Sequence, residues 1–165
     1  MSLYLPLFKA LNEANVQYVV VGGIATILHG YVRATSDIDL VVDLHVDEAT
    51  KVIAVLTDAG YQPKVPVQAI EFADASKRQQ WIDEKGMQVF SMYQPENPLL
   101  TIDLFVKQPI SYEELNTRAV TMELDGIKVR VCSIDDLIKM KKLAGRDKDL
   151  ADIEHLTRIK EYEKE

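Results

Sequence analysis

The feature that most constrains this chain is a pair of acids at the start of an apolar strand. Asp37 and Asp39 flank Ile38, and the apolar run 40–42 follows. Because strand side chains alternate between faces, both carboxylates point to one face, roughly 7 Å apart from a rise of ~3.3 Å per residue. Ile38 and Leu40 then point the other way, into a core. Since two like charges repel unless something positive lies between them, the pattern predicts a sheet with one packed face and one face open to a cation.

A third acid repeats this arrangement in a later strand. Asp103 lies between Ile102 and Leu104 in the apolar run 100–106, where a buried, unpaired charge would be costly. If this strand pairs beside the first, three carboxylates converge on one patch. Such a patch can hold two divalent ions, Mg²⁺ or Mn²⁺, about 3.5–4 Å apart. The alternative is that each acid only lines a solvated face of the sheet.

A glycine pair precedes the acids. Gly22 and Gly23 follow a predicted strand at 18–21 and begin a short predicted helix at 24–31. Glycines let the backbone approach a ligand closely, with N–H groups and a helix N-terminus pointing at it. Such a turn suits the phosphates of a triphosphate. The alternative is that the turn needs glycine only for its geometry.

The polar residues just before Asp37 are further candidates for phosphate binding. Arg33 can neutralise phosphate charge, and Thr35 and Ser36 can donate hydrogen bonds. Equally, these three residues can form an ordinary polar loop.

The remaining pattern alternates helices and strands and then ends in a hairpin and two helices. Helical spacing or capping predicts helices over 3–15, 46–59, about 75–84, 134–144 and 148–160, and strands over 87–93, 100–106, 119–124 and 127–131. Asp125-Gly126 predicts the hairpin turn between the last two strands. We therefore expect an α/β (α+β) protein with a mixed central sheet and flanking helices. The length and the absence of linkers or repeats predict a single domain, residues 1–165, with C-terminal helices.

Composition excludes several classes of protein. The net charge of −7 argues against a broad basic surface for nucleic acid. Apolar runs are too short for a membrane span, and the N-terminus lacks a signal-peptide pattern. Cys132 is the single cysteine, which excludes an internal disulfide and suits a cytoplasmic protein.

Cations gather in one segment of this acidic chain. Lys139 and Lys142 lie three residues apart, and Lys142 and Arg146 four apart, so they share a helix face. That face is either a solvated surface paired with nearby acids or a clamp for a triphosphate.

Together these motifs resemble a known signature. Val21-Gly22-Gly23, thirteen intervening residues, the pair Asp37-Ile38-Asp39 and a later strand acid resemble the signature of the DNA polymerase beta-type nucleotidyltransferase superfamily. The full run 21–40 is similar to small bacterial stand-alone nucleotidyltransferases, including the abortive-infection type found in toxin–antitoxin systems. The segment 137–152 is similar to the part of that family in which a helix lysine and an Arg-x-x-Asp turn close the site. By that comparison Lys141, with Lys142 as the alternative, Arg146 and Asp149 match.

The resemblance implies a polymerase beta-like fold and transfer of a nucleoside monophosphate from an NTP, such as ATP, to an acceptor hydroxyl. Asp37, Asp39 and Asp103 would be the catalytic and metal-binding residues. The implied nucleotide-binding residues are Gly22, Gly23, Arg33, Thr35, Ser36, Lys141 and Arg146. The implied acceptor is a small molecule, a tRNA or a protein, and a partner protein of a toxin–antitoxin pair is expected. Two alternatives stay open: a catalytically silent nucleotide-binding or antitoxin-like module, and a metal-dependent phosphate hydrolase.

Overall fold

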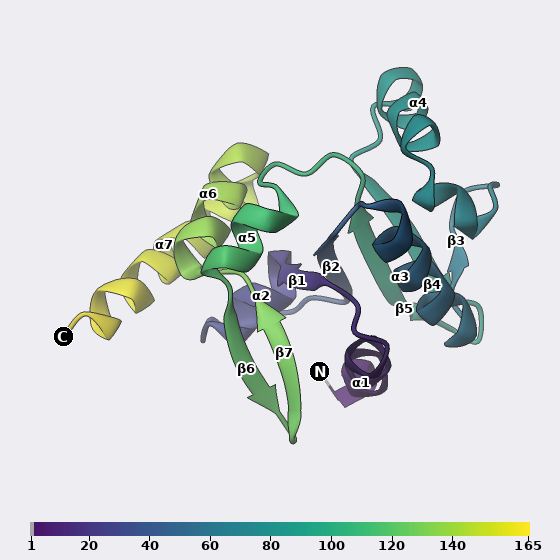
Figure 1. The fold of residues 1–165 in the computed structure, drawn as a ribbon. Helices are drawn as coiled ribbons and strands as arrows, with labels where there is room; N and C mark the ends of the chain where they lie inside the picture. Colours follow the sequence, from purple (N-terminus) through teal and green to yellow (C-terminus); the bar gives the residue numbers. More distant parts are fainter. Residues whose placement is uncertain (1) are drawn as a thin grey trace.

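A seven-stranded mixed sheet forms the centre of the protein, in a computed structural model that describes residues 2–165 (Figure 1). The strand order is β3-β4-β5-β2-β1-β7-β6. The strands are β1 (Tyr18–Val21), β2 (Asp37–Val42), β3 (Gln62–Pro63), β4 (Val89–Gln94), β5 (Asn97–Phe105), β6 (Val120–Leu124) and β7 (Ile127–Val131). The helices are α1 (Leu5–Glu13), α2 (Gly22–Leu28), α3 (Val46–Asp58), α4 (Ala75–Lys85), α5 (Tyr112–Arg118), α6 (Ile134–Ala144) and α7 (Asp147–Glu163), with 3-10 turns η1 (Ser2–Tyr4) and η2 (Ala69–Ala73).

The middle of the sheet is formed by the strands with the most continuous apolar sequence. All four residues of β1 are buried, as expected for a strand covered on both faces. β1 runs antiparallel to β2, and β2 runs parallel to β5. The predicted α/β class with a mixed central sheet is therefore confirmed.

Two helices close the chain and lie side by side at one end of the molecule. Figure 1 shows α6 and α7 packed together, away from the projecting β6–β7 hairpin. The hydroxyl of Ser133 accepts a hydrogen bond from the Asp136 amide at 3.1 Å, so it caps α6 as the sequence predicts. After Gly145, which takes a left-handed conformation with φ of +65°, α7 turns back along α6. This return brings the first turns of α7 beside the cationic segment.

Several boundaries differ from the sequence prediction. The first helix is shorter than 3–15, because Asn15 with φ of +56° leaves helical geometry. The helix expected over 24–31 begins two residues earlier, at Gly22 itself. Helix α5 was not predicted, since it is only 7 residues long and buries only Tyr112 and Leu115. Within residues 2–165, no helix is long and apolar enough to cross a bilayer.

Candidate functional site

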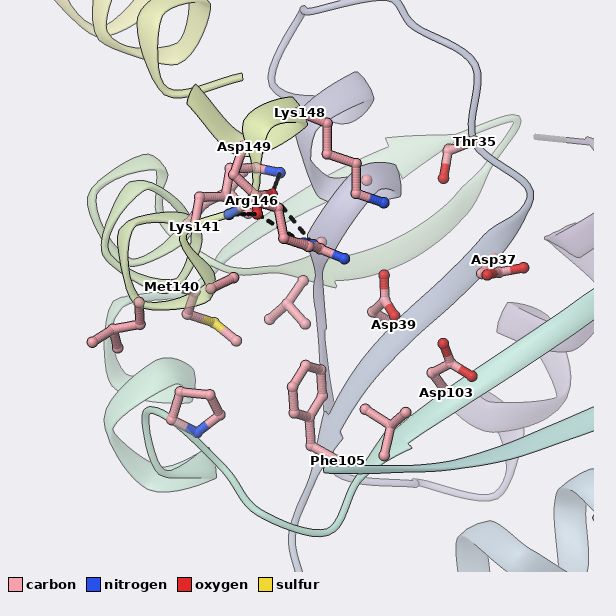
Figure 2. Close-up of a pocket in the computed structure, with 18 of the residues that line it drawn as sticks. Thr35, Asp37, Asp39, Asp103, Phe105, Met140, Lys141, Arg146, Lys148 and Asp149 are labelled. Atoms are coloured by element: carbon pink, nitrogen blue, oxygen red, sulfur yellow. Dashed lines mark hydrogen bonds and ion pairs between the residues drawn. The ribbon is translucent and has the colours of Figure 1, made fainter. Parts of the chain in front are cut away.

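The register between β2 and β5 brings the three predicted acids together. Asp39 and Asp103 are direct partners across these parallel strands, and Asp37 lies two residues before Asp39 on the same face. Ile38 and Ile102, which are also partners, point to the opposite face and are fully buried. Figure 2 shows the three carboxylates entering one cavity. The three carboxylates therefore converge because β2 pairs with β5, as the sequence argument required.

Burial makes the ionised form of this cluster unfavourable. It raises the pKa of Asp39 to about 7, and the nearby carboxylates of Asp103 and Asp37 add to the shift. Burial also raises the pKa of Asp103, although a 2.5 Å hydrogen bond from the Ser91 hydroxyl opposes this. A cation among these side chains would favour the ionised forms.

The donor set suits a hard divalent cation such as Mg²⁺, since three carboxylates supply only oxygen ligands. The oxygens do not form a preassembled cage. Among residues 2–165, the one group of three acid or histidine ligand atoms that all lie within 4.8 Å of one another is Asp43, His45 and Glu113. Asp43 and His45 follow the far end of β2 and Glu113 lies in the first turn of α5, and none of the three lines the cavity.

The glycine turn lies directly against the acids. Gly22 has φ of +69°, and a Cβ built on it would lie 2.2 Å from Oδ2 of Asp39. A Cβ on Gly23 would lie 2.6 Å from Oγ1 of Thr35 and 3.1 Å from Nη2 of Arg33. The nearby Gly23 amide favours the ionised carboxylate of Asp39 and so lowers its pKa slightly, against the effect of burial. Glycine is therefore required at position 22 by both conformation and space, and at position 23 by space.

The loop between α2 and β2 brings its polar residues to different places. Arg33 and Thr35 line the cavity. The hydroxyl of Ser36 donates a 3.1 Å hydrogen bond to Oδ1 of Asp37, and Ser36 is not one of the lining residues. Ser36 thus contacts the site through Asp37.

The cations of the C-terminal segment are held by two buried acids. Nζ of Lys141 lies 2.7 Å from Oδ2 of Asp152 and 3.9 Å from Oδ1 of Asp149. Arg146 donates two side-chain hydrogen bonds to Asp149, at 2.8 and 3.2 Å. Burial alone would raise the pKa of Asp149, but these bonds and the charge of Lys141 hold that pKa below its usual value. Lys141 is therefore ion-paired with acids, but it is buried, unlike the side chains of the solvated surface that was one of the two alternatives.

These elements enclose a cavity of about 570 Å³ that has a polar and an apolar side. Figure 2 shows Arg146 and Lys148 near the acids, with Phe105 and Met140 on the other side. All but Ser36 of the predicted site residues line it; the full lining is Val21, Gly22, Gly23, Arg33, Thr35, Asp37, Asp39, Gln88, Val89, Asp103, Phe105, Pro109, Leu137, Met140, Lys141, Leu143, Ala144, Arg146, Lys148 and Asp149.

The sequence analysis did not assign the apolar side or Lys148 to the site. Phe105 could have been found, because it lies two residues after Asp103 on the same face of β5. Lys148 belongs to the cationic segment, but nothing in its spacing distinguishes it from the solvated lysines around it.

Solved structures similar to this fold are nucleotidyltransferases. The lincosamide antibiotic adenylyltransferase LnuA, solved with lincomycin bound, matches with a TM-score of 0.61 and 17% identity over 93% of each chain. ANT(2")-Ia in complex with adenylyl-2"-tobramycin matches with a TM-score of 0.59 and 16% identity, over 94% of this chain and 86% of that one. An antigenic nucleotidyltransferase-like protein from Paracoccidioides brasiliensis matches with a TM-score of 0.56 and 18% identity, over 94% and 73%. At these identities the likeness concerns the fold.

Comparison with curated proteins finds no significant sequence match. A family model described as "Nucleotidyltransferase of unknown function (DUF6036)" matches residues 6–164. The chain therefore belongs to this nucleotidyltransferase family, and the predicted resemblance to nucleotidyltransferases is confirmed.

Proposed function

We propose that this protein transfers a nucleoside monophosphate from an NTP to an acceptor hydroxyl and releases pyrophosphate. The observation that carries the proposal is the meeting of three strand carboxylates with a glycine turn in one cavity. We treat residues 1–165 as a single nucleotidyltransferase domain whose helices α6 and α7 close the site.

In this proposal the acids hold two divalent ions, Mg²⁺ or Mn²⁺. Asp37 and Asp39 would bind the ion that accompanies the triphosphate, and together with Asp103 they would bind a second. The raised pKa values of Asp39 and Asp103 support this, because a bound cation would relieve the cost of their ionisation. When bound, such ions neutralise phosphate charge and lower the pKa of the acceptor hydroxyl.

The triphosphate would lie along the glycine turn. Gly22 and Gly23 have no side chains of their own that would keep phosphate away from the turn, and Thr35 supplies a hydroxyl at the same place. Arg33 and Arg146 line the same cavity and would offset the charge that develops on the departing pyrophosphate.

Lys141 and Ser36 contribute less directly. Lys141 lines the cavity, but its ammonium is shared with Asp152, so it would act mainly through the field it adds. Ser36 would help to orient Asp37, to which it already donates a hydrogen bond.

The chemical step joins the acceptor oxygen to the α-phosphorus as the bond from that phosphorus to the bridging oxygen of the β-phosphate breaks. Pyrophosphate leaves with the electron pair of that bond. The acceptor proton passes to a carboxylate, for which Asp103 is our candidate; its other proposed role is to orient the acceptor oxygen. Ser91 donates a hydrogen bond to one oxygen of Asp103, so the second oxygen would take the proton.

The acceptor would be a small molecule, a tRNA or a protein. Two of the similar structures hold lincomycin and adenylyl-2"-tobramycin, so small molecules are the first class to test. A protein acceptor would suit a toxin–antitoxin pair, with the second protein of the pair as partner. We place the reaction in the cytoplasm, where the reduced state of the buried thiol of Cys132 is maintained.

The test is incubation with Mg²⁺ and an NTP labelled at the α-phosphate, together with aminoglycosides and lincosamides, a tRNA pool or a cell extract. A transferase leaves the label on an acceptor, and the Asp103→Asn variant should lose that product. Label released as free NMP without an acceptor would indicate a hydrolase instead. Binding of NTP with neither product would indicate a catalytically silent module.

A further inference from the structure

One buried acid next to the cavity is not explained by the proposed chemistry. Asp152 on α7 is 1% exposed and does not line the cavity. Its two oxygens nevertheless contact two cations that do: Oδ2 lies 2.7 Å from Nζ of Lys141, and Oδ1 lies 3.0 Å from Nε of Arg33. Asp152 therefore joins α7 to α6 and to a loop residue that is 119 positions away in the sequence.

Asp152 forms part of a stripe along α7 that binds this loop. His155 and Ile159 follow it at spacings of three and seven, which places them on one helix face. The His155 ring stacks on Tyr31, with centroids 4.0 Å apart and planes at 11°. Cδ1 of Ile159 lies 3.7 Å from the Cβ position of Gly30. The stripe thus fixes residues 30–33, just before the loop reaches Thr35 and Asp37.

The contact with Arg33 is an ion pair rather than an aligned hydrogen bond. The N–H at Nε does not point at the carboxylate, and Nε is buried with no other acceptor among the residues that the structure describes. Nη2 of the same guanidinium lies beside Gly23, at 3.1 Å from its Cβ position. The position of Arg33 at the glycine turn therefore depends on the charge of Asp152.

Stability alone is a weak reason to bury this cluster. Buried ion pairs often contribute little net stability, because desolvation offsets their attraction, and apolar residues would fill the same space. Lys141, Arg146 and Arg33 carry three positive charges, against two negative charges on Asp149 and Asp152. One positive charge is left over, and these cations line the cavity. The cluster is thus arranged to present positive charge where an anion would bind.

We propose that Asp152 is a positioning residue of the nucleotide site, which holds Arg33 and Lys141 where a bound triphosphate meets them. This inference rests on the proposed function, since it takes the anion in the cavity to be a triphosphate. Asp152 itself touches neither the phosphates nor the reacting atoms.

The test compares Asp152→Asn with Asp135→Asn by calorimetry of ATP and AMP binding in Mg²⁺. Asp135 is the control for loss of an acid between the same two helices, because it pairs with Lys160 at the surface and lies outside the cavity. Charge-assisted hydrogen bonds from a displaced Arg33 to the phosphates would weaken, and the charge of Lys141 would move, so ATP affinity should fall about ten- to a hundredfold in Asp152→Asn. AMP affinity should fall only a few-fold, and the binding stoichiometry should stay unchanged. A purely structural defect would instead lower the binding stoichiometry for both ligands, because less of the protein is folded, and the ratio of the ATP and AMP affinities would stay the same.

A double-mutant cycle tests the link to Arg33. Arg33→Met should weaken ATP binding strongly in the wild type and much less in the Asp152→Asn background, because Arg33 is already displaced there. If Asp152→Asn does not fold, the Lys141→Met/Asp152→Asn double variant removes the unpaired buried cation and serves as the background. An undiminished effect of Arg33→Met in that background would overturn the proposal.

The outcomes separate this inference from the proposed function. If the wild type binds ATP and Asp152→Asn matches Asp135→Asn for both ligands, only the positioning role of Asp152 fails. If the wild type binds no NTP with Mg²⁺, the proposed function fails and this inference fails with it.

Discussion

The ionised form of Asp39 should destabilise the metal-free protein, so Asp39→Asn is expected to stabilise it at neutral and alkaline pH. Burial, with Asp103 and Asp37 nearby, raises the pKa of Asp39 from 3.8 to about 7. A carboxyl whose pKa is higher in the folded state gives stability that is fully present below the unfolded pKa. That stability is lost as the pH rises through the folded pKa. The cost of ionising Asp39 therefore develops between about pH 4 and pH 7 and is constant above that range.

The magnitude follows from the same shift. A difference of about 3 pKa units at ~1.36 kcal/mol each gives an upper limit of roughly 4 kcal/mol. Because Asp39 and Asp103 are coupled and water can enter the cavity, we expect about half, ~2 kcal/mol. For a chain of 165 residues this corresponds to a gain in Tm of roughly 4–8 °C at pH 8.

The assay is thermal and urea unfolding of wild type and Asp39→Asn in chelator, at intervals from pH 4 to pH 9. The pH dependence is what tests the reasoning. The amide introduced by Asp39→Asn can change stability in other ways, but those changes do not depend on pH because an amide does not titrate in this range. Asp58→Asn, exposed at the end of α3 and outside the cavity, is the control. A stability difference between Asp39→Asn and wild type that stays flat across this range would refute the reasoning. A loss of stability at pH 8 as large as that of a core substitution would mean that Asp39 is structural.

Three further predictions follow from the site. Calorimetry should show that ATP binds more tightly with Mg²⁺ or Mn²⁺ than in chelator, and equal affinity would contradict the two-ion proposal. Gly22→Ala should abolish ATP binding, because its Cβ would displace the Asp39 carboxylate; Gly86→Ala, at a similar φ of +60° but in open space, should lose only stability. Arg146→Met should weaken ATP binding about tenfold and AMP binding a few-fold at most, because in the proposed function the 60% exposed side chain of Arg146 would contact mainly the added phosphates. Lys160→Met is the control for that measurement, and identical behaviour of the two variants would remove Arg146 from the proposed phosphate contacts.

The parts of the site that sequence predicted are those governed by local geometry. Strand periodicity places Asp37 and Asp39 on one face whatever the rest of the chain does. The glycine pair indicates that another group lies close to the backbone, without saying which group. The structure identifies the group next to Gly22 as the Asp39 carboxylate. The pairing of β2 with β5 could only be assumed from the sequence. The register between two strands distant in the chain cannot be recognised in the sequence of either strand alone.

Helix α5 shows where local signals were present but too weak. Ser111 caps it, with a 3.2 Å hydrogen bond from the Glu114 amide, and Glu113 and Glu114 occupy its first turn. With 7 residues and two buried side chains, however, it shows less than two turns of hydrophobic periodicity. Such a helix is stabilised mainly by tertiary contacts, so its sequence pattern alone does not predict it.

Sequence reasoning found cations of the site but missed, for a physical reason, the acid that holds them. Arg33 and Lys141 were predicted to face phosphate because each is a cation near a motif, and both do line the cavity. Their closest charged partner is nevertheless Asp152, whose carboxylate had no assigned role, because a charge pair formed across 119 residues follows no period and no spacing. A cation held in this way is already oriented before the ligand arrives, so it loses less side-chain entropy on binding than a free surface lysine would. The buried pairing with Asp152, which sequence analysis did not find, is therefore what would make these side chains effective in a phosphate site.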